Sequence, residues 1–206
     1  MKRSRPRPAR TPSREVRADY DRDSIVVYQA YGEGIAEAAL KAGRLVPPFS
    51  YRRMTWIKPS FRWLMVRSQW ASKPGQTRVL ALRIPRTRWE EALAAAVLTD
   101  PDPRVYPSAE AWRERFASAR VHVQWDPERS LRGSKLEERS IQVGIGRELA
   151  RAYAEDWVSE VRDLTPIARK LRERLRRGDL RQARRLLPPE RPYPLPPALR
   201  LALGAA

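Results

Sequence analysis

Hydrophobic residues recur along this chain with two different spacings. Alternating or β-branched runs predict strands at residues 25–28, 77–85, 120–125 and 136–144. Helical spacing predicts helices at residues 33–43, 60–68, 87–100, 108–119, 146–164 and 165–187, the last interrupted at Gly178. The two patterns mix without a regular strand–helix–strand order. The sequence therefore predicts an α+β fold, with a small mixed or antiparallel sheet flanked by helices and a helical C-terminal third.

The length of 206 residues suits one domain. Residues 1–15 are rich in arginine, proline and serine and predict a disordered basic arm. Residues 16–206 then form a single globular α+β domain that ends in an extended, proline-rich tail at 188–206. Within that domain, Thr87 and Glu90 have the spacing of a helix capping box.

The charge of the chain points to an anionic partner. It carries 42 basic residues against 24 acidic ones, a net charge of +18, and only six of the basic residues are lysines. A bias of the genome towards arginine codons explains arginine in place of lysine, but not the excess of cations. We therefore expect RNA or another nucleic acid as the partner.

The composition also excludes several kinds of site. The absence of cysteine excludes disulfide-linked partners and thiolate metal sites, and the single histidine, His122, excludes a histidine-rich metal centre. No run of apolar residues is long enough to span a membrane, and no apolar segment follows the basic N-terminus as in a secretory signal. We expect a cytoplasmic protein with no membrane partner.

Lys58, in the stretch "YRRMTWIKPSFRWLMVRSQW", is the first candidate for chemistry. Nearby arginines and tryptophans favour a lowered pKa, and a neutral lysine is a nucleophile, whereas arginine stays charged. Three interpretations are open: a nucleophile, a phosphate contact or a structural residue. The usual ligase signature, in which a glycine follows the lysine closely, is missing. Ser60 begins a helix here, and helix N-termini favour anions. Arg53, Ser60 and Arg67 are thus candidate phosphate ligands.

The motif "WDPER" follows a predicted strand and places two carboxylates together. Asp126 and Glu128 are candidates for a catalytic base or for magnesium binding, with Arg129 as a phosphate ligand. The alternative is an ordinary β-turn. In "RSIQVG", Gln142 and Arg139 are candidate nucleotide ligands on a strand that faces either a ligand or water.

Aromatic residues provide candidates for base stacking. Tyr28, Tyr31 and Trp56 lie near polar residues, although core packing is the alternative for each of them. The densest basic segment is the C-terminal run "RKLRERLRRGDLRQARR", which is either a phosphate-binding surface or a solvated helix face. Its candidate nucleic-acid ligands are Arg172, Arg176, Arg177, Arg184 and Arg185.

Six motifs together resemble one known family. They are "VYQAY" at 27–31, "VPPF" at 46–49, "RMTWIKPSF" at 53–61, "VQWDPER" at 123–129, "RSIQVG" at 139–144 and "PYPLP" at 192–196. In this order, they resemble the family catalogued as domain of unknown function 4291, from about residue 14 to the C-terminus. The resemblance implies a single domain and does not name a reaction.

These features favour an enzyme that processes nucleic acid with a nucleotide cofactor. An RNA ligase or nucleotidyltransferase is the first hypothesis, with Lys58 at the phosphates of ATP and with magnesium held by Asp126 or Glu128. The alternatives are an ADP-ribosyltransferase-like enzyme that uses NAD and a nucleic-acid-binding module without catalysis.

Overall fold

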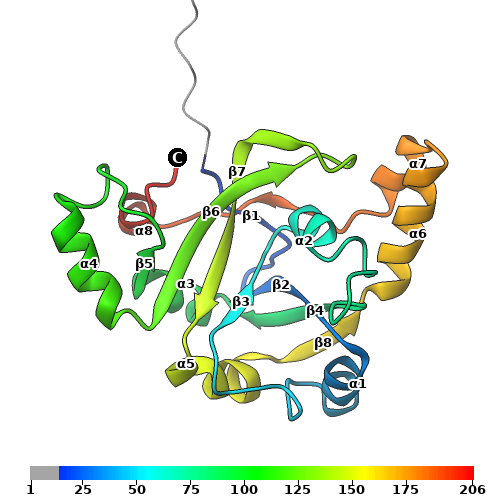
Figure 1. Cartoon of the computed structure of the whole chain (residues 1–206), viewed down its shortest axis with the longest axis horizontal. Helices are drawn as coiled ribbons and strands as arrows, with labels where there is room; N and C mark the ends of the chain where they lie inside the picture. The colour runs from blue at the N-terminus through cyan, green and yellow to red at the C-terminus, as the bar shows by residue number, and fades with distance from the viewer. Residues whose placement is uncertain (1–13) are drawn as a thin grey trace, which may run out of the picture.

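The computed structural model describes residues 14–206 of the chain (Figure 1). Residues 1–13 of the predicted basic arm lie outside the described residues. Arg14, the first described residue, forms an ion pair with Asp102 at 2.5 Å. The division into an arm and a single domain stays a prediction.

Two sheets form the centre of the fold. Strands β2 (Ser24–Tyr31), β4 (Arg78–Pro85) and β8 (Glu160–Asp163) make an antiparallel sheet in the order β2-β4-β8. The strands of the second sheet are β3 (Thr55–Ile57), β5 (Ala96–Leu98), β6 (Val121–Arg129) and β7 (Lys135–Ile145). Their order is β3-β7-β6-β5, and only β5 and β6 are parallel.

Helices surround these sheets (Figure 1). They are α1 (Glu33–Ala42), α2 (Phe61–Arg67), α3 (Arg86–Ala94), α4 (Ala109–Ser118), α5 (Arg147–Ala152), α6 (Thr165–Arg176), α7 (Leu180–Arg185) and α8 (Pro197–Ala202). A π-helical segment, η1 (Tyr153–Trp157), continues α5, and the short strands β1 (Arg17–Ala18) and β9 (Arg191–Pro192) pair with each other. The predicted α+β class, with small antiparallel and mixed sheets, is confirmed.

The two sheets meet where the end of β3 passes β2. The backbone N–H of Tyr28 donates to the carbonyl of Lys58 at 2.7 Å. The side-chain amide of Gln29 donates to Thr55 Oγ1 at 2.7 Å and to the carbonyl of Trp56 at 3.1 Å. These bonds fix Lys58 at the junction of the two sheets.

Helix α2 begins directly after this junction. Ser60 caps it as predicted, because its hydroxyl oxygen accepts a hydrogen bond from the N–H of Trp63 at 3.3 Å. The carboxylate of Glu190 accepts from the N–H of Phe61 at 2.7 Å. Two N–H groups at the N-terminus of α2 are therefore satisfied by groups of the chain itself, and Ser60 acts as the helix cap, while its role as a phosphate ligand stays a prediction.

The predicted helix at 146–164 is wrong in its second half. The helical backbone ends with η1 at Trp157, and Glu160–Asp163 pairs with β4 as strand β8. Pairing with the edge of β4 satisfies backbone N–H and C=O groups of both strands. The stability gained from this pairing outweighs the helix propensity of the segment.

Three smaller predictions also need correction. Helix α3 begins one residue before Thr87, with Pro85 at its N-cap, so the capping box does not form. Residues 126–129 belong to β6, since the pairing with β7 continues through them, and do not form a loop. The tail is not extended throughout, because it contains α8.

Candidate functional site

A cleft of about 670 Å³ lies at the junction of the two sheets, and we call it the Lys58 cleft. Strands β2, β3, β6 and β7 and helix α2 all contribute to it. The residues that line it include Tyr31, Arg53, Trp56, Lys58, Trp63, Arg67, Gln124, Asp126 and Gln142. The cleft thus combines aromatic rings, cations, amides and one carboxylate.

Lys58 is 8% exposed, which is unusual for a lysine. Its Nζ donates to the carbonyl of Trp56 at 3.3 Å and lies 5.2 Å from the ring centroid of Trp63. Burial, assisted by the charge of Arg67, lowers the pKa of Lys58 to about 7, while the charge of Asp126 opposes this shift. A large fraction of Lys58 is therefore neutral and nucleophilic at neutral pH.

Asp126 is held in the same cleft by two amides. Gln142 Nε2 donates to its Oδ2 at 2.7 Å, and Gln124 Nε2 donates to its Oδ1 at 3.1 Å. Burial raises the pKa of Asp126, whereas these hydrogen bonds and the charge of Lys58 act in the opposite direction. The carboxylate is fixed in position and is able to accept a proton.

The strand register explains why these polar residues converge. Gln124 lies opposite Gln142 in the pairing of β6 with β7. Alternate residues of the same strands, such as Val123 and Val143, are fully buried in the core. One face of the hairpin is thus apolar and the other is polar towards the cleft. Sequence reasoning identified Gln142 but missed Gln124, although its alternation with Val123 indicated this face.

Gly144 makes room for Trp56 in the cleft. It lies opposite Trp56 in the pairing of β3 with β7. A Cβ atom on Gly144 would lie 3.1 Å from the Trp56 ring and 2.6 Å from the sulfur of Met54. The missing side chain leaves room for the Trp56 indole and the Met54 sulfur, which is a function of Gly144 that the sequence alone did not indicate.

The predicted stacking residues separate into two groups. Tyr31 and Trp56 line the Lys58 cleft, together with Trp63. Tyr28 does not, because it is 1% exposed and its ring packs edge-on against Phe61 with 5.4 Å between the centroids. The alternative of core packing applies to Tyr28.

The predicted phosphate ligands also separate. Arg53 and Arg67 line the Lys58 cleft. Arg129 lines a smaller hollow next to it, and Arg139 lines a different, larger cavity.

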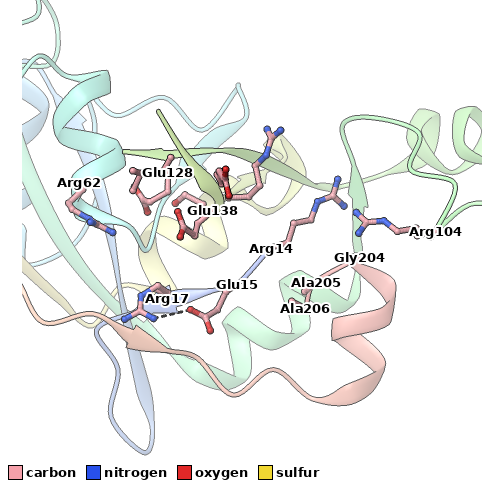
Figure 2. A pocket seen from close by; sticks show the side chains of 14 residues that line it. Arg14, Glu15, Arg17, Arg62, Arg104, Glu128, Glu138, Gly204, Ala205 and Ala206 are labelled. Carbon is pink, nitrogen blue, oxygen red and sulfur yellow. Dashed lines mark hydrogen bonds and ion pairs between the residues drawn. The ribbon is translucent and has the colours of Figure 1, made fainter. Parts of the chain in front are cut away.

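That larger cavity, of about 800 Å³, also contains Glu128 (Figure 2). Much of its charge is already neutralised within the chain, since Arg14 and Arg104 both pair with Asp102, and Arg17 pairs with Glu15. Glu128 is 5% exposed and accepts a hydrogen bond from the N–H of Arg129 at 2.7 Å. The structure therefore does not bring Glu128 together with Lys58 and Asp126.

One comparison with known proteins identifies the family. The family model described as Domain of unknown function (DUF4291) matches residues 15–193. The chain belongs to this family. The comparison with curated proteins gave no significant match. All residues of the Lys58 cleft fall inside the DUF4291 match, whereas α8 lies beyond it.

The basic C-terminal helices α6 and α7 lie next to α2 (Figure 1). Arg172, Arg176, Arg184 and Arg185 are exposed, and none of them forms an ion pair within residues 14–206. Arg177 pairs with Glu173 at 2.5 Å. Most of the predicted nucleic-acid ligands of this DUF4291 protein are thus free cations on one helical unit.

Metal ions and membranes are the remaining possible partners of residues 14–206. No group of three or more histidine, cysteine, aspartate or glutamate side chains converges there in a way that would hold a metal ion. No helix in this part of the chain is long and apolar enough to cross a membrane.

Proposed function

We propose that this protein is a nucleotidyltransferase of the RNA ligase type, in which Lys58 is the nucleophile. The observation that carries the proposal is the burial of Lys58 in a cleft that lowers its pKa to about 7. Covalent catalysis by lysine requires this neutral amine. We further propose that the protein works in the cytoplasm on RNA, in keeping with its net charge of +18.

In the proposed first step, Lys58 Nζ attacks the α-phosphorus of ATP. An N–P bond forms, the bond from that phosphorus to the oxygen bridging to the β-phosphate breaks, and pyrophosphate leaves. The amine loses a proton, for which Asp126 is an acceptor in the same cleft. The product is Lys58 with AMP attached through a phosphoramidate bond.

The cleft also contains groups for each part of the nucleotide. Trp56, Trp63 and Tyr31 offer rings for the base. Arg53 and Arg67 are positioned for the phosphates, because arginine binds phosphate oxygens in pairs. Among residues 14–206, Asp126 is the only carboxylate that lines the cleft, so magnesium would bind mainly through the phosphates of the nucleotide and water, as is usual for this ion.

The NAD alternative has less support. An ADP-ribosyltransferase-like site needs an aromatic residue, a polar residue on a strand and often a glutamate on a strand, and the sequence offers Tyr28, Gln142 and Glu128 for these roles. Tyr28 is buried in the core, and Glu128 lines the larger cavity instead of the Lys58 cleft. Of the residues chosen for that alternative, only Gln142 lines the cleft.

Incubation with ATP labelled at the α-phosphate tests the proposal directly. We expect acid-labile label on the protein, located at Lys58 by peptide mapping. Lys58→Arg should reduce labelling to background, because arginine keeps the charge but does not lose its proton. Lys41→Ala, which removes an exposed lysine on α1, is the matched control and should label like the parent protein.

Three outcomes would contradict the proposal. The first is label that remains in Lys58→Arg. The second is label from NAD in place of ATP, which would favour ADP-ribosyl transfer. The third is salt-sensitive RNA binding with no label from either nucleotide, which would favour a binding module without catalysis.

A further inference from the structure

A smaller hollow of about 330 Å³ opens beside the Lys58 cleft. It shares Trp63, Arg67 and Asp126 with the cleft, so the two spaces adjoin along these side chains. Lys73 in the loop after α2 and Arg129 at the end of β6 line the hollow as well, together with Val66, Gln69 and Pro127. A group bound there would lie next to whatever occupies the cleft.

The hollow is strongly cationic. Within residues 14–206, Arg67, Lys73 and Arg129 form no ion pair with any carboxylate, whereas many arginines elsewhere do. Among the described residues, the guanidinium of Arg129 donates only to the carbonyl of Gly133, at 3.3 Å. Asp126, the single carboxylate that residues 14–206 contribute to the hollow, is already bonded to two amides. Three unpaired cations around a small space favour a compact, doubly charged anion such as a terminal phosphate.

The loop that carries Lys73 has an unusual backbone. Gln69, Trp70 and Ala71 have φ angles of 51°, 57° and 60°, so three consecutive residues other than glycine adopt the left-handed conformation. This conformation is sterically unfavourable for residues with a Cβ atom, because the Cβ comes close to the following carbonyl oxygen. Strain of this kind persists where the surrounding structure enforces it, and it gathers at functional sites.

Buried contacts enforce this conformation. Ser68 is fully buried, and its carbonyl accepts from the N–H groups of Ser72 and Lys73, both at 3.1 Å. Its hydroxyl accepts from the N–H of Ala71 at 3.4 Å. The result is a tight loop that brings Gln69 and Lys73 to the hollow.

We propose that this hollow binds the terminal phosphate of the nucleic-acid strand that accepts the nucleotide from Lys58. The proposal rests on the proposed function and assigns the place of its second substrate. Arg67 is shared by both spaces, so it would bridge the nucleotide phosphate and the acceptor phosphate. Lys73 and Arg129 would contact the acceptor alone.

The transfer step follows from this placement. An oxygen of the terminal phosphate attacks the phosphorus of the Lys58-linked AMP, and a P–O bond forms. The P–N bond breaks, its electron pair returns to Nζ, and Nζ takes up a proton, for which Asp126 is the donor in the shared wall. Lys58 is then a free amine again, and the strand carries AMP through a pyrophosphate linkage.

Lys73→Gln separates the two steps, because Lys73 does not line the Lys58 cleft. The protein is first labelled with ATP and then chased with RNA that carries a 5′-phosphate. The ratio of transfer rate to labelling rate should fall about ten- to a hundredfold, which corresponds to the loss of one charge-assisted hydrogen bond. Arg129→Gln should act in the same direction. Arg132→Gln, an exposed residue in the same hairpin that lines neither space, should leave the ratio unchanged.

A binding measurement keeps this proposal distinct from the proposed function. The parent protein should bind RNA with a 5′-phosphate more tightly than the same RNA with a 5′-hydroxyl, and Lys73→Gln should remove that preference, even if Lys58 never becomes labelled. Equal affinity of the parent protein for both RNAs would overturn the proposal. An unchanged transfer ratio in Lys73→Gln, or a fall of labelling as large as that of transfer, would also overturn it.

Discussion

Lys58 shows how the surroundings of one residue lower its pKa. The chain has six lysines among 42 basic residues, and arginine cannot replace lysine where a proton must leave. The sequence placed arginines and tryptophans near Lys58 but did not show that its Nζ is buried. Burial is the largest cause of the lowered pKa, and it depends on the junction of two sheets whose strands are far apart in sequence.

The pH dependence of labelling follows from this pKa. Lys58 has a pKa of about 7 in the folded protein, so the neutral, reactive form grows as the pH rises through about 7. The labelling rate should therefore increase through this range and level off above it. Measurement of initial labelling rates between about pH 5.5 and 9 gives the apparent pKa of the nucleophile.

Two substitutions should move that apparent pKa in opposite directions. The charge of Arg67 lowers the pKa of Lys58, and the charge of Asp126 raises it. Arg67→Gln should thus shift the inflection to higher pH and Asp126→Asn to lower pH, each by roughly 0.3–1 unit. Arg53→Gln, an exposed cation of the same cleft, is the control and should lower the rate without moving the inflection. Shifts of the same sign in both variants would rule out this electrostatic account.

At the scale of elements, the sequence pattern correctly predicted strands and helix ends that depend on residues close together in the chain. The strand pattern of "VYQAY", the stop at Gly43 and the start of α2 at Ser60 are all confirmed. The helix at 146–164 failed because β8 gains its stability by pairing with β4, which no local pattern reveals. The candidate site shows the same division: alternation identified Gln142, whereas the separation of Glu128 from Asp126 depends on the irregular register near Pro127.

The contact of the C-terminal tail with α2 provides a prediction about stability. Burial raises the pKa of Glu190 to about 7, and its hydrogen bond from Phe61 opposes that shift. A carboxyl group whose pKa is raised by folding stabilises the folded protein fully at pH values below its pKa in the unfolded chain. For Glu190 that pKa is near 4.3, and the stabilisation is lost as the pH rises through about 7, its pKa in the folded protein.

Glu190→Gln keeps an oxygen acceptor for Phe61 but does not ionise. The variant should match the parent protein near pH 4.5 and become more stable than it by up to about 3 kcal/mol above pH 7.5. Urea denaturation at a series of pH values measures this difference. Glu37→Gln, on the exposed surface of α1, is the control and should show no such pH dependence. A constant difference at every pH would mean that Glu190 does not titrate in this range.

At the scale of the whole molecule, the free cations of α6 and α7 lie on the side of the Lys58 cleft. Phe61, Leu64 and Met65 of α2 share one buried cluster with Ala168 and Leu171 of α6. The same helix α2 carries Trp63 and Arg67 into the cleft. A strand bound along α6 and α7 would therefore lie on helices that share one buried cluster with a wall of the cleft.

RNA binding should depend on this side of the molecule through its charge alone. Each phosphate contact that is lost should make the slope of log affinity against log salt shallower by about 0.7 for single strands. Arg172→Gln with Arg176→Gln, and separately Arg184→Gln with Arg185→Gln, should flatten the slope by about 1–1.5 and weaken binding similarly for all sequences.

The matched control is Arg115→Gln with Arg120→Gln, which removes two exposed arginines, in and just after α4, that form no ion pair within residues 14–206. This helix lies on the opposite side of the molecule from α6 and α7 (Figure 1). Titration of fluorescent single-stranded RNA at several salt concentrations measures the three slopes. General attraction by the net charge of +18 would make the slope shallower by the same amount in the two test variants and in the control variant. A flatter slope in the α6 and α7 variants alone therefore identifies a binding surface. Equal slopes for test and control pairs would instead mean that the net charge acts without a preferred face.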